Sequence, residues 1–239
     1  MPRPSGPAIS TSSGPADIWR VEPGSTASVA VVSGPGATSG SAQFTVGASD
    51  ALSDYSNDVG VSPDTNRGCG ALDNGTDTYS ADALATASPQ ALTPGARVTA
   101  GGLTFTWPRA QSCQNDNVRA LGQTVLLPHR SGAGQIGFLG AATDGAHSGT
   151  VTIHYTDGST GTAKLAQSDW GTTPGAGNTL VSAMTYRNQA LGRQDHAFYV
   201  DEQSVPVDPE KVVASITLPT DKDMHIFAMA QDGVPSADH

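Results

Sequence analysis

Apolar and polar side chains alternate with a period of two along several short stretches of the chain. The clearest are Gly102–Trp107, Gly149–Tyr155 and Thr162–Ala166, and glycine, proline or aspartate separates such stretches. Successive side chains of a strand point to opposite faces of a sheet, so this alternation is typical of half-buried antiparallel strands. Asp157 and Gly158 stand between two alternating runs, and glycine supplies the positive φ that a tight hairpin turn needs. The pattern predicts an all-β, antiparallel β-sandwich.

The same reading places a main domain at residues 54–232. The expected strands lie near residues 77–85, 96–107, 122–128, 135–143, 149–156, 161–168, 183–189, 196–204, 212–219 and 224–231. The one helix-like stretch, Asp82–Ala87, is too short and too near Pro89 to matter. If the strands alternate in direction, the segment before the first strand lies at one end of the sandwich with loops 108–121, 144–148, 169–182 and 205–211.

Residues 1–50 differ in composition from the main domain. Residues 1–16 are rich in proline, glycine, serine and threonine, which predicts a flexible linker. Thr26–Val32 and Ala42–Val46 alternate and predict a hairpin. These two runs resemble the end of the NPCBM-associated domains of bacterial glycosidases. The resemblance implies that this segment holds the tail strands of an immunoglobulin-like domain.

Charge narrows the classes of partner. Of the 22 acidic residues, only Glu22, Glu202 and Glu210 are glutamate, and the remaining 19 are aspartate, a turn and loop residue, which again favours an all-β fold. The formal net charge is −10 and no cluster of Lys and Arg occurs, so neither a nucleic acid nor an anionic membrane is expected as a partner. A neutral polyhydroxylated ligand or a cationic one fits better, although the charge is also explained by solubility alone.

Cysteine usage and composition favour a secreted or cell-surface bacterial protein. Cys69 and Cys113 lie far apart, in polar loop contexts, without CxxC spacing, and both fall at the same expected end of the sandwich. They predict a disulfide, with two free thiols as the alternative. No apolar run approaches about 18 residues, and residues 1–6 have no hydrophobic core of a signal peptide. We expect the chain to be a piece of a longer secreted protein.

Several short sequence motifs follow one another along the main domain, and their order and spacing are more specific than any one of them. They are Tyr55–Gly60, Asp73–Gly75, Tyr79–Ala81, Leu92–Gly95, Phe105–Pro108, Asp116–Val118, Ile136–Ala142, Ser168–Trp170, Tyr186–Asn188 and Val212–Pro219. Together they resemble a C-terminal accessory module of secreted actinobacterial glycosidases, including enzymes similar to alpha-mannosidases and alpha-fucosidases. The resemblance implies a jelly roll of the galactose-binding-like type. The two cysteines depart from the family pattern, so a disulfide there is an addition to it.

Sugar recognition needs an aromatic face and a few fixed amides, carboxylates or guanidinium groups. The expected loop end gathers such residues: Asp73, Asn74, Asn115, Asp116, Asn117, Asp169, Trp170, Tyr186, Arg187 and Asn188. Trp170 beside Asp169 is the best stacking candidate. The alternatives are that Trp170 seals the core, that Asp73–Gly75 is only a turn, and that Arg187 pairs with Asp169. Trp107 is expected to be a core residue.

No cofactor is required by the sequence, but a structural calcium is a possibility. Acids and amides crowd one region before the first strand: Asp54, Asn57, Asp58, Asp64, Asn66, Asp73 and Asp77. Calcium takes six to eight oxygen ligands. No EF-hand spacing occurs, so ordinary charged turns are the alternative reading.

Catalytic motifs are mostly absent, and no catalytic residue is assigned. There is no GxSxG, HExxH or CxxC motif, and Gly132–Gly137 matches GxGxxG in a strand-like context that does not suit a dinucleotide. His147 and His154 have no zinc-like context. The sequence predicts a non-catalytic carbohydrate-binding or accessory module that contacts a glycan and the catalytic domain of a parent glycosidase. The alternatives are a structural spacer and a small glycan hydrolase.

Overall fold

The computed structural model describes residues 26–31, 40–45, 52–73 and 75–235. The chain divides into two units, Met1–Gly47 and Ala48–His239. In the first unit, β1 (Thr26–Val31) and β2 (Gly40–Thr45) form an antiparallel pair. The expected hairpin is therefore confirmed, whereas the expected linker at residues 1–16 lies outside the described residues.

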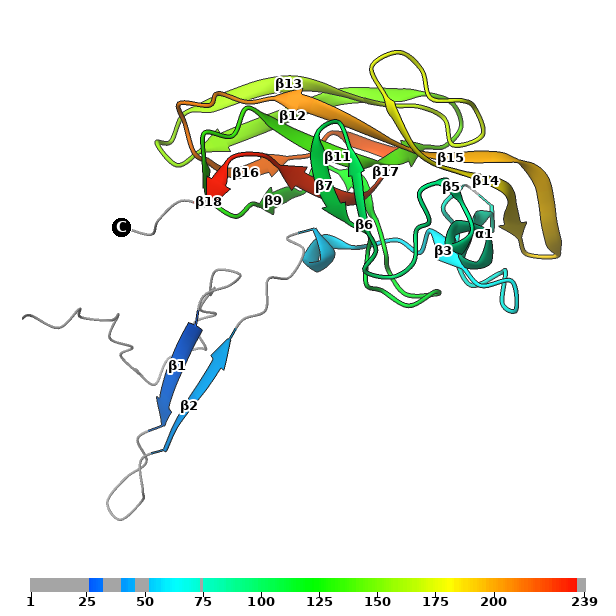
Figure 1. The fold of residues 1–239 in the computed structure, drawn as a ribbon, viewed down its shortest axis with the longest axis horizontal. Helices are drawn as coiled ribbons and strands as arrows, with labels where there is room; N and C mark the ends of the chain where they lie inside the picture. Colours follow the sequence, from blue (N-terminus) through cyan, green and yellow to red (C-terminus); the bar gives the residue numbers. More distant parts are fainter. Residues whose placement is uncertain (1–25, 32–39, 46–51, 74, 236–239) are drawn as a thin grey trace, which may run out of the picture. The chain divides into compact units, whose positions relative to one another are not determined.

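The second unit contains two main sheets (Figure 1). The larger runs β3-β4-β14-β15-β11-β17-β8, with β5 paired to β14, and the smaller runs β13-β12-β16-β9. The larger sheet consists of β3 (Val61–Ser62), β4 (Thr78–Ser80), β5 (Ser88–Pro89), β8 (Val118–Leu121), β11 (Gln135–Ala142), β14 (Thr179–Gln189), β15 (Gly192–Pro206) and β17 (Thr220–Gln231). The smaller sheet consists of β9 (Thr124–Leu126), β12 (His147–Tyr155), β13 (Thr160–Gln167) and β16 (Val213–Thr217). β6 (Arg97–Ala100) pairs with β7 (Leu103–Thr106), and β10 (Arg130–Ser131) with β18 (Val234–Pro235). The expected all-β sandwich is confirmed.

The larger sheet is buried on both faces. One apolar cluster, which includes Phe138, Ile153 and Ile216, fills the space between the two sheets. A second cluster, which includes Phe105 and Trp107, lies on the other face, where β6–β7 and α1 cover the sheet (Figure 1). Because β11 lies between β15 and β17, seven of its eight residues are buried. This explains why β11 reads as a continuous apolar run instead of an alternating one.

One stretch that was expected to be a strand contains a short helix in its second half. Residues 77–85 were expected to be extended, but β4 ends at Ser80 and a short helix, α1 (Ala81–Ala85), follows. The Ser80 side chain accepts a hydrogen bond from the Ala83 amide at 3.1 Å, which is a helix N-cap. Ala83 and Leu84 are buried, so packing stabilises a helix too short to form alone. Neither α1 nor the 3-10 turn η1 (Ser53–Tyr55) has the length and apolarity needed to span a membrane.

Glycine turns divide one other expected strand and bound another. The stretch 96–107 is a hairpin of β6 and β7, because Gly101 and Gly102 both adopt positive φ and turn the chain. The stretch 122–128 contains only β9, and Gly122, with φ of 80°, separates it from β8.

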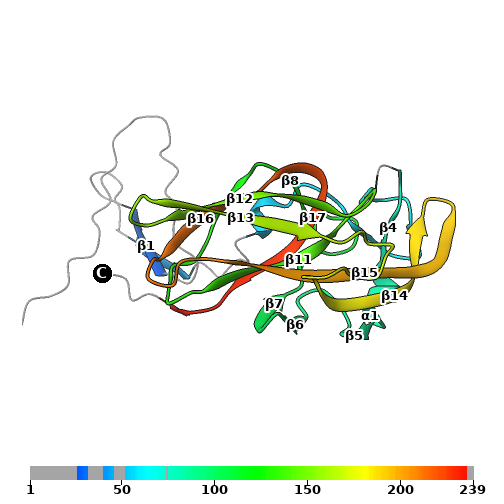
Figure 2. The ribbon, with the colours of Figure 1, turned by 90° about the horizontal axis from the view of Figure 1, so that it is seen from above.

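The expected grouping of loops is wrong for one of them. Gly145 donates to Asp169, so loops 144–148 and 169–182 do meet. Lys211, however, pairs with Asp157 in the β12–β13 turn at the opposite end of β12. The strands do not simply alternate over the full length of the sheet, because β14 pairs with residues 192–202 of β15, whereas β11 pairs with residues 201–206. The β14–β15 hairpin therefore extends beyond the rest of the large sheet (Figures 1 and 2).

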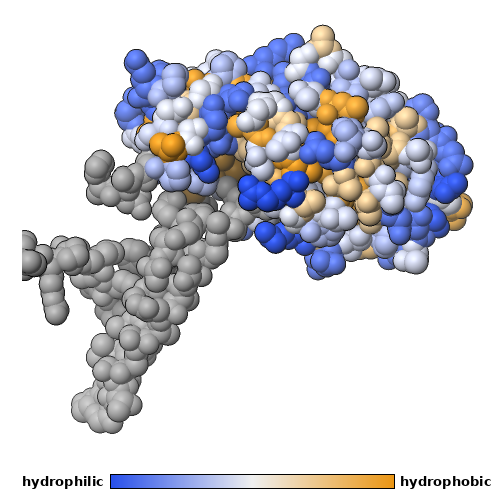
Figure 3. Space-filling model, in the orientation of Figure 1, coloured by the Kyte–Doolittle hydropathy of each residue, from blue (hydrophilic) through white to orange (hydrophobic). Residues whose placement is uncertain are grey.

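The surface is a mixture of polar and apolar residues. The face drawn in Figure 3 carries hydrophobic residues in small groups between hydrophilic ones. The large hydrophobic side chains that are exposed among the described residues lie on separate elements: Leu121, Leu126, Leu180, Leu191 and Val234. Single exposed apolar residues of this kind are normal for a folded domain.

Candidate ligand-binding site

Two hollows flank the segment Asn115–Asn117. The first is a shallow groove of about 430 Å³ lined by residues that include Asn57, Asp58, Cys69, Ala71, Thr76 and Asn115. The second is a smaller, more enclosed cavity of about 130 Å³, bounded by α1, residues 92–94, residues 107–112, Val61 and Asp116. Both hollows lie next to residues that the sequence analysis selected.

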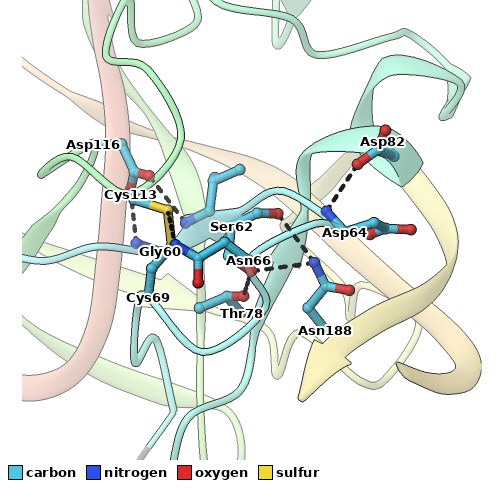
Figure 4. Close-up of a disulfide and its surroundings, with 11 residues drawn as sticks. Gly60, Ser62, Asp64, Asn66, Cys69, Thr78, Asp82, Cys113, Asp116 and Asn188 are labelled. Atoms are coloured by element: carbon cyan, nitrogen blue, oxygen red, sulfur yellow. Dashed lines mark hydrogen bonds between the residues drawn. A yellow bond between two sulfur atoms is a disulfide. The ribbon is translucent and has the colours of Figure 1, made fainter. Parts of the chain in front are cut away.

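A disulfide and backbone hydrogen bonds fix this region. Cys69 and Cys113 are bonded, with 5.4 Å between their Cα atoms, so the expected disulfide is confirmed (Figure 4). Cys113 donates its backbone amide to Val61 at 3.1 Å, and the Asp116 amide donates to Asp58 at 2.9 Å. The segment that lies between the two hollows is thus bound to β3 and to the loop before it.

Asp116 is a buried carboxylate that accepts three hydrogen bonds. Its Oδ1 accepts from the Gly60 amide at 2.9 Å (Figure 4) and from Asn117 Nδ2 at 3.0 Å, and its Oδ2 accepts from the Val61 amide at 2.9 Å. Burial raises the pKa of Asp116 to about 7; the hydrogen bonds from Asn117, Gly60 and Val61 oppose the shift, and the nearby charge of Asp58 adds to it.

Gly60 is needed for this arrangement. A Cβ at this position would lie 2.7 Å from Asn117 Nδ2 and 2.9 Å from both Leu72 and Phe227. A larger residue would therefore displace the loop whose amide binds Asp116.

Arg187 brings together another part of the predicted site. Its guanidinium pairs with Asp73 at 3.3 Å and with Asp77 at 2.6 Å, and it lies 4.7 Å from the Trp170 ring centroid. The alternative pairing of Arg187 with Asp169 is wrong, because Asp169 instead accepts from Gly145 and Gly171. Asp73 is therefore an ion-pair partner of Arg187, and the network joins the loop before β4 to β14.

Trp170 does not offer a stacking face. Its side chain is only 3% exposed, and its ring packs edge-on against Tyr79 at 5.2 Å and at a tilt against Phe198 at 4.9 Å. The stacking interpretation is corrected, because the ring is enclosed by aromatic neighbours and Arg187. Tyr186 is half-buried: its hydroxyl donates to Asp64 at 3.0 Å and Arg193 covers its ring at 4.7 Å. Trp107 is a core residue, as expected, and stacks on Phe227 at 4.7 Å.

The predicted asparagines have different environments. Asn188 is fully buried, donates to Ser62 and accepts from Arg67. Asn117 is also fully buried, whereas Asn115 is exposed in the groove. Asn74 lies outside the described residues. Of the predicted ligand-binding residues that the structure describes, only Asn115 lies at the surface of a hollow with an exposed side chain.

A polar network around His225 lies beneath this region. His225 Nδ1 is 3.1 Å from Asn117 Oδ1 and 3.3 Å from Asp58 Oδ2, and His225 Nε2 is 3.5 Å from Thr143 Oγ1. The order resembles a nucleophile, base and orienting acid. Thr143 is only 1% exposed, so its hydroxyl has no access for a substrate. These side chains form a polar network within the core.

The region expected to hold calcium does not converge on one point. Asp73 and Asp77 bind Arg187, and Asp64 accepts from Ser80 at 2.6 Å. A calcium ion stays a prediction that the structure does not test.

One group among the described residues could hold a metal ion: His147, Asp221 and Asp223. Their ligand atoms lie within 4.8 Å of one another. His147 Nδ1 is 2.8 Å from Asp221 Oδ2, and Lys222 Nζ already lies 2.6 Å from Asp223 Oδ1. The sequence analysis missed this group because β12 and β17 supply its members. His154, considered with His147, instead contacts Thr217.

Asp201 is a second buried acid, but it lines neither hollow. Burial raises its pKa to about 6, against hydrogen bonds from Ser168 and Asn178, while Glu202 adds to the increase. Because Asp201 lies on β15 and is 2% exposed, it belongs to the interior of the sandwich.

The comparisons with known proteins can now be set beside this geometry. Residues 51–233 match the AziU2-like beta-sandwich domain. The chain belongs to the AziU2-like β-sandwich family. A comparison with curated proteins finds no match. The match agrees with the β-sandwich but does not support the narrower resemblance to a galactose-binding-like glycosidase module. In this AziU2-like domain, the sequence analysis missed the depth of Asp116 and its place in a cavity wall, because its amide partners lie 55 and 56 positions away.

Proposed function

We propose that the AziU2-like domain is a non-catalytic accessory module that binds a neutral glycan in the shallow groove. The observation that carries the proposal is the groove's lining. Asn57, Thr76 and Asn115 are exposed there, and Asp58 adds a half-buried carboxylate. Amides, a hydroxyl and a carboxylate are the groups that bind sugar hydroxyls.

The charge of the groove favours a ligand without negative charge. No lysine or arginine is among the described residues that line it, and the chain has a formal net charge of −10. An anionic polymer would therefore be repelled. A neutral polyhydroxylated ligand agrees with the resemblance to galactose-binding-like modules of secreted glycosidases, and we include that secreted bacterial context in the proposal.

Asn115 has a side chain suited to contact such a ligand. Its Nδ2 donates to the Ser56 carbonyl at 3.2 Å, which fixes the amide plane. The carboxamide oxygen of this exposed residue is then oriented without needing the ligand to order it. A fixed polar group loses less conformational entropy on binding than a free one.

A second candidate function is a module that packs against a partner domain and binds no sugar. The observation that favours it is the burial of aromatic rings. In residues 52–73 and 75–235, every tryptophan, tyrosine and phenylalanine is buried or half-buried. Glycan-binding modules commonly use an exposed ring against the C–H face of a sugar.

A glycan array with the full chain, with and without EDTA, distinguishes the two candidates. Binding of a neutral glycan supports the proposal, and an Asn115→Ala variant should then weaken it about tenfold, as expected for loss of one hydrogen bond. Thr160→Ala, on the exposed side of β13, is the control and should bind normally. No binding to any glycan, with an intact fold, would favour the packing module.

A further inference from the structure

We propose that the cavity beside Asp116 is a binding site for a small organic cation, separate from the groove. The cavity has a volume of about 130 Å³. An engineered protein cavity of about 150 Å³ accommodates benzene. The proposed ligand is therefore an ammonium group on an apolar body of about five carbons.

The walls match the apolar part of such a ligand. Ala81 and Ala85 of α1, Leu92, Pro94 and Trp107 supply carbon surface on several sides. Trp107 is held in place because its ring stacks on Phe227 at 4.7 Å with 15° between the planes. A fixed aromatic wall contributes both apolar contact and attraction for a cation.

Asp116 supplies the charge that the cation would meet. It lines the cavity and is only 4% exposed. In the part of the chain that the structure describes, no Lys, Arg or His forms an ion pair with it. A buried carboxylate without a counter-charge is unfavourable unless it is protonated or paired.

The hydrogen bonds of Asp116 leave one oxygen open to a further donor. Oδ1 accepts two bonds, from Gly60 and Asn117, whereas Oδ2 accepts only the bond from the Val61 amide. Each carboxylate oxygen can accept about two hydrogen bonds. An ammonium N–H can therefore bind Oδ2 without displacing a partner that holds the loop.

The same position explains the raised pKa of Asp116. Burial raises it to about 7, and the Asp58 carboxylate contributes in the same direction. An empty cavity thus favours the neutral acid near neutral pH, while a bound cation favours the carboxylate. The hydrogen bonds from two fixed amides keep the acid oriented in both states.

The test uses NMR spectra of the ¹⁵N-labelled full chain and two probes of the same shape. Piperidinium chloride is the cation, and tetrahydropyran is its neutral counterpart, each compared with an equal concentration of sodium chloride. We expect saturable shifts of the Gly60 and Val61 amides with piperidinium at millimolar concentration, and none with tetrahydropyran.

Two variants locate the binding. Ala85→Leu, at an exposed position of α1 in the cavity wall, should abolish the shifts, and Ala91→Leu, at an exposed position outside it, should leave them unchanged. Asp116→Asn should remove the preference for piperidinium. If Asp116→Asn does not fold, the comparison of Ala85→Leu with Ala91→Leu still decides whether the cavity binds piperidinium.

Three results would overturn the proposal: no shift with piperidinium, equal shifts with both probes, or shifts that survive Ala85→Leu. The glycan proposal is tested separately, because Asn115→Ala alters the groove and should leave the piperidinium shifts intact.

Discussion

Arg187 and Asp116 are both charged groups largely removed from water, but their surroundings differ. Arg187 has two carboxylates within ion-pair distance and two aromatic rings, Trp170 and Phe198, within 5.0 Å of its guanidinium. Asp116 has three hydrogen-bond donors, and the described residues provide it with no counter-cation.

The difference shows which of the two regions is suited to a ligand. A charge whose partners all come from the protein stabilises the fold and leaves nothing for a ligand to contact. A buried charge beside a cavity, held by backbone amides and without an opposite charge, costs stability near neutral pH. Perturbed acids of this kind gather at functional sites.

The largest expected effect is at Trp170. Trp170→Ala should lower the free energy of unfolding by up to about 5 kcal/mol, because it leaves a cavity among Tyr79, Phe198 and Arg187. Urea denaturation measures this. A loss below about 1 kcal/mol would show that the ring is not packed as the structure has it.

The second prediction concerns pH. The folded pKa of Asp116 is about 7, against 3.8 for an ordinary aspartate. The unfolded chain therefore releases this proton first as pH rises, and stability falls between about pH 4 and pH 7. At about 1.4 kcal/mol per pKa unit, the fall is on the order of 4 kcal/mol.

Asp116→Asn should reduce that fall. Some pH dependence remains in the variant, because Asp201 is raised in the same direction. Unfolding free energies measured from pH 4 to pH 8 check this. Parallel curves for the wild type and the variant would mean that Asp116 titrates normally.

The third and smaller effect is at Arg187. Arg187→Met keeps contact with the aromatic rings but leaves Asp73 and Asp77 without their cation, and should cost about 2–3 kcal/mol. Arg193→Met is the control: its ion pair with Asp195 is more than half exposed and should contribute less than about 1 kcal/mol. Equal losses for the two variants, measured by urea denaturation, would remove the contrast between the networks.

Local patterns predicted most of the strands. The alternation in Gly149–Tyr155 and Thr162–Ala166 depends only on neighbouring residues, and β12 and β13 lie where it placed them. The pattern predicts a single strand where β6 and β7 form a hairpin, although Gly101 and Gly102 mark its turn. Helix α1 looks too short to form when judged from its sequence, because its stability comes from packing and from the Ser80 cap.

The site was harder to predict because burial depends on distant segments. Trp170 and Asp169 looked like a surface pair, but the ring lies between Tyr79 and Phe198, from β4 and β15. Asp116 stood among polar neighbours in a loop, and its depth follows from contacts with residues 60 and 61. The pairing of Cys69 with Cys113 was accessible because only two cysteines exist.

The measurement that tests the central claim most directly is the titration of the Asp116 carboxyl carbon by ¹³C NMR, with and without piperidinium. Asp116 should titrate with a midpoint of about 7 in the free chain, and piperidinium should lower that midpoint while tetrahydropyran leaves it unchanged. A midpoint near 3.8 in the free chain, or a midpoint that piperidinium does not change, would contradict the account of Asp116 as a buried acid that binds a cation.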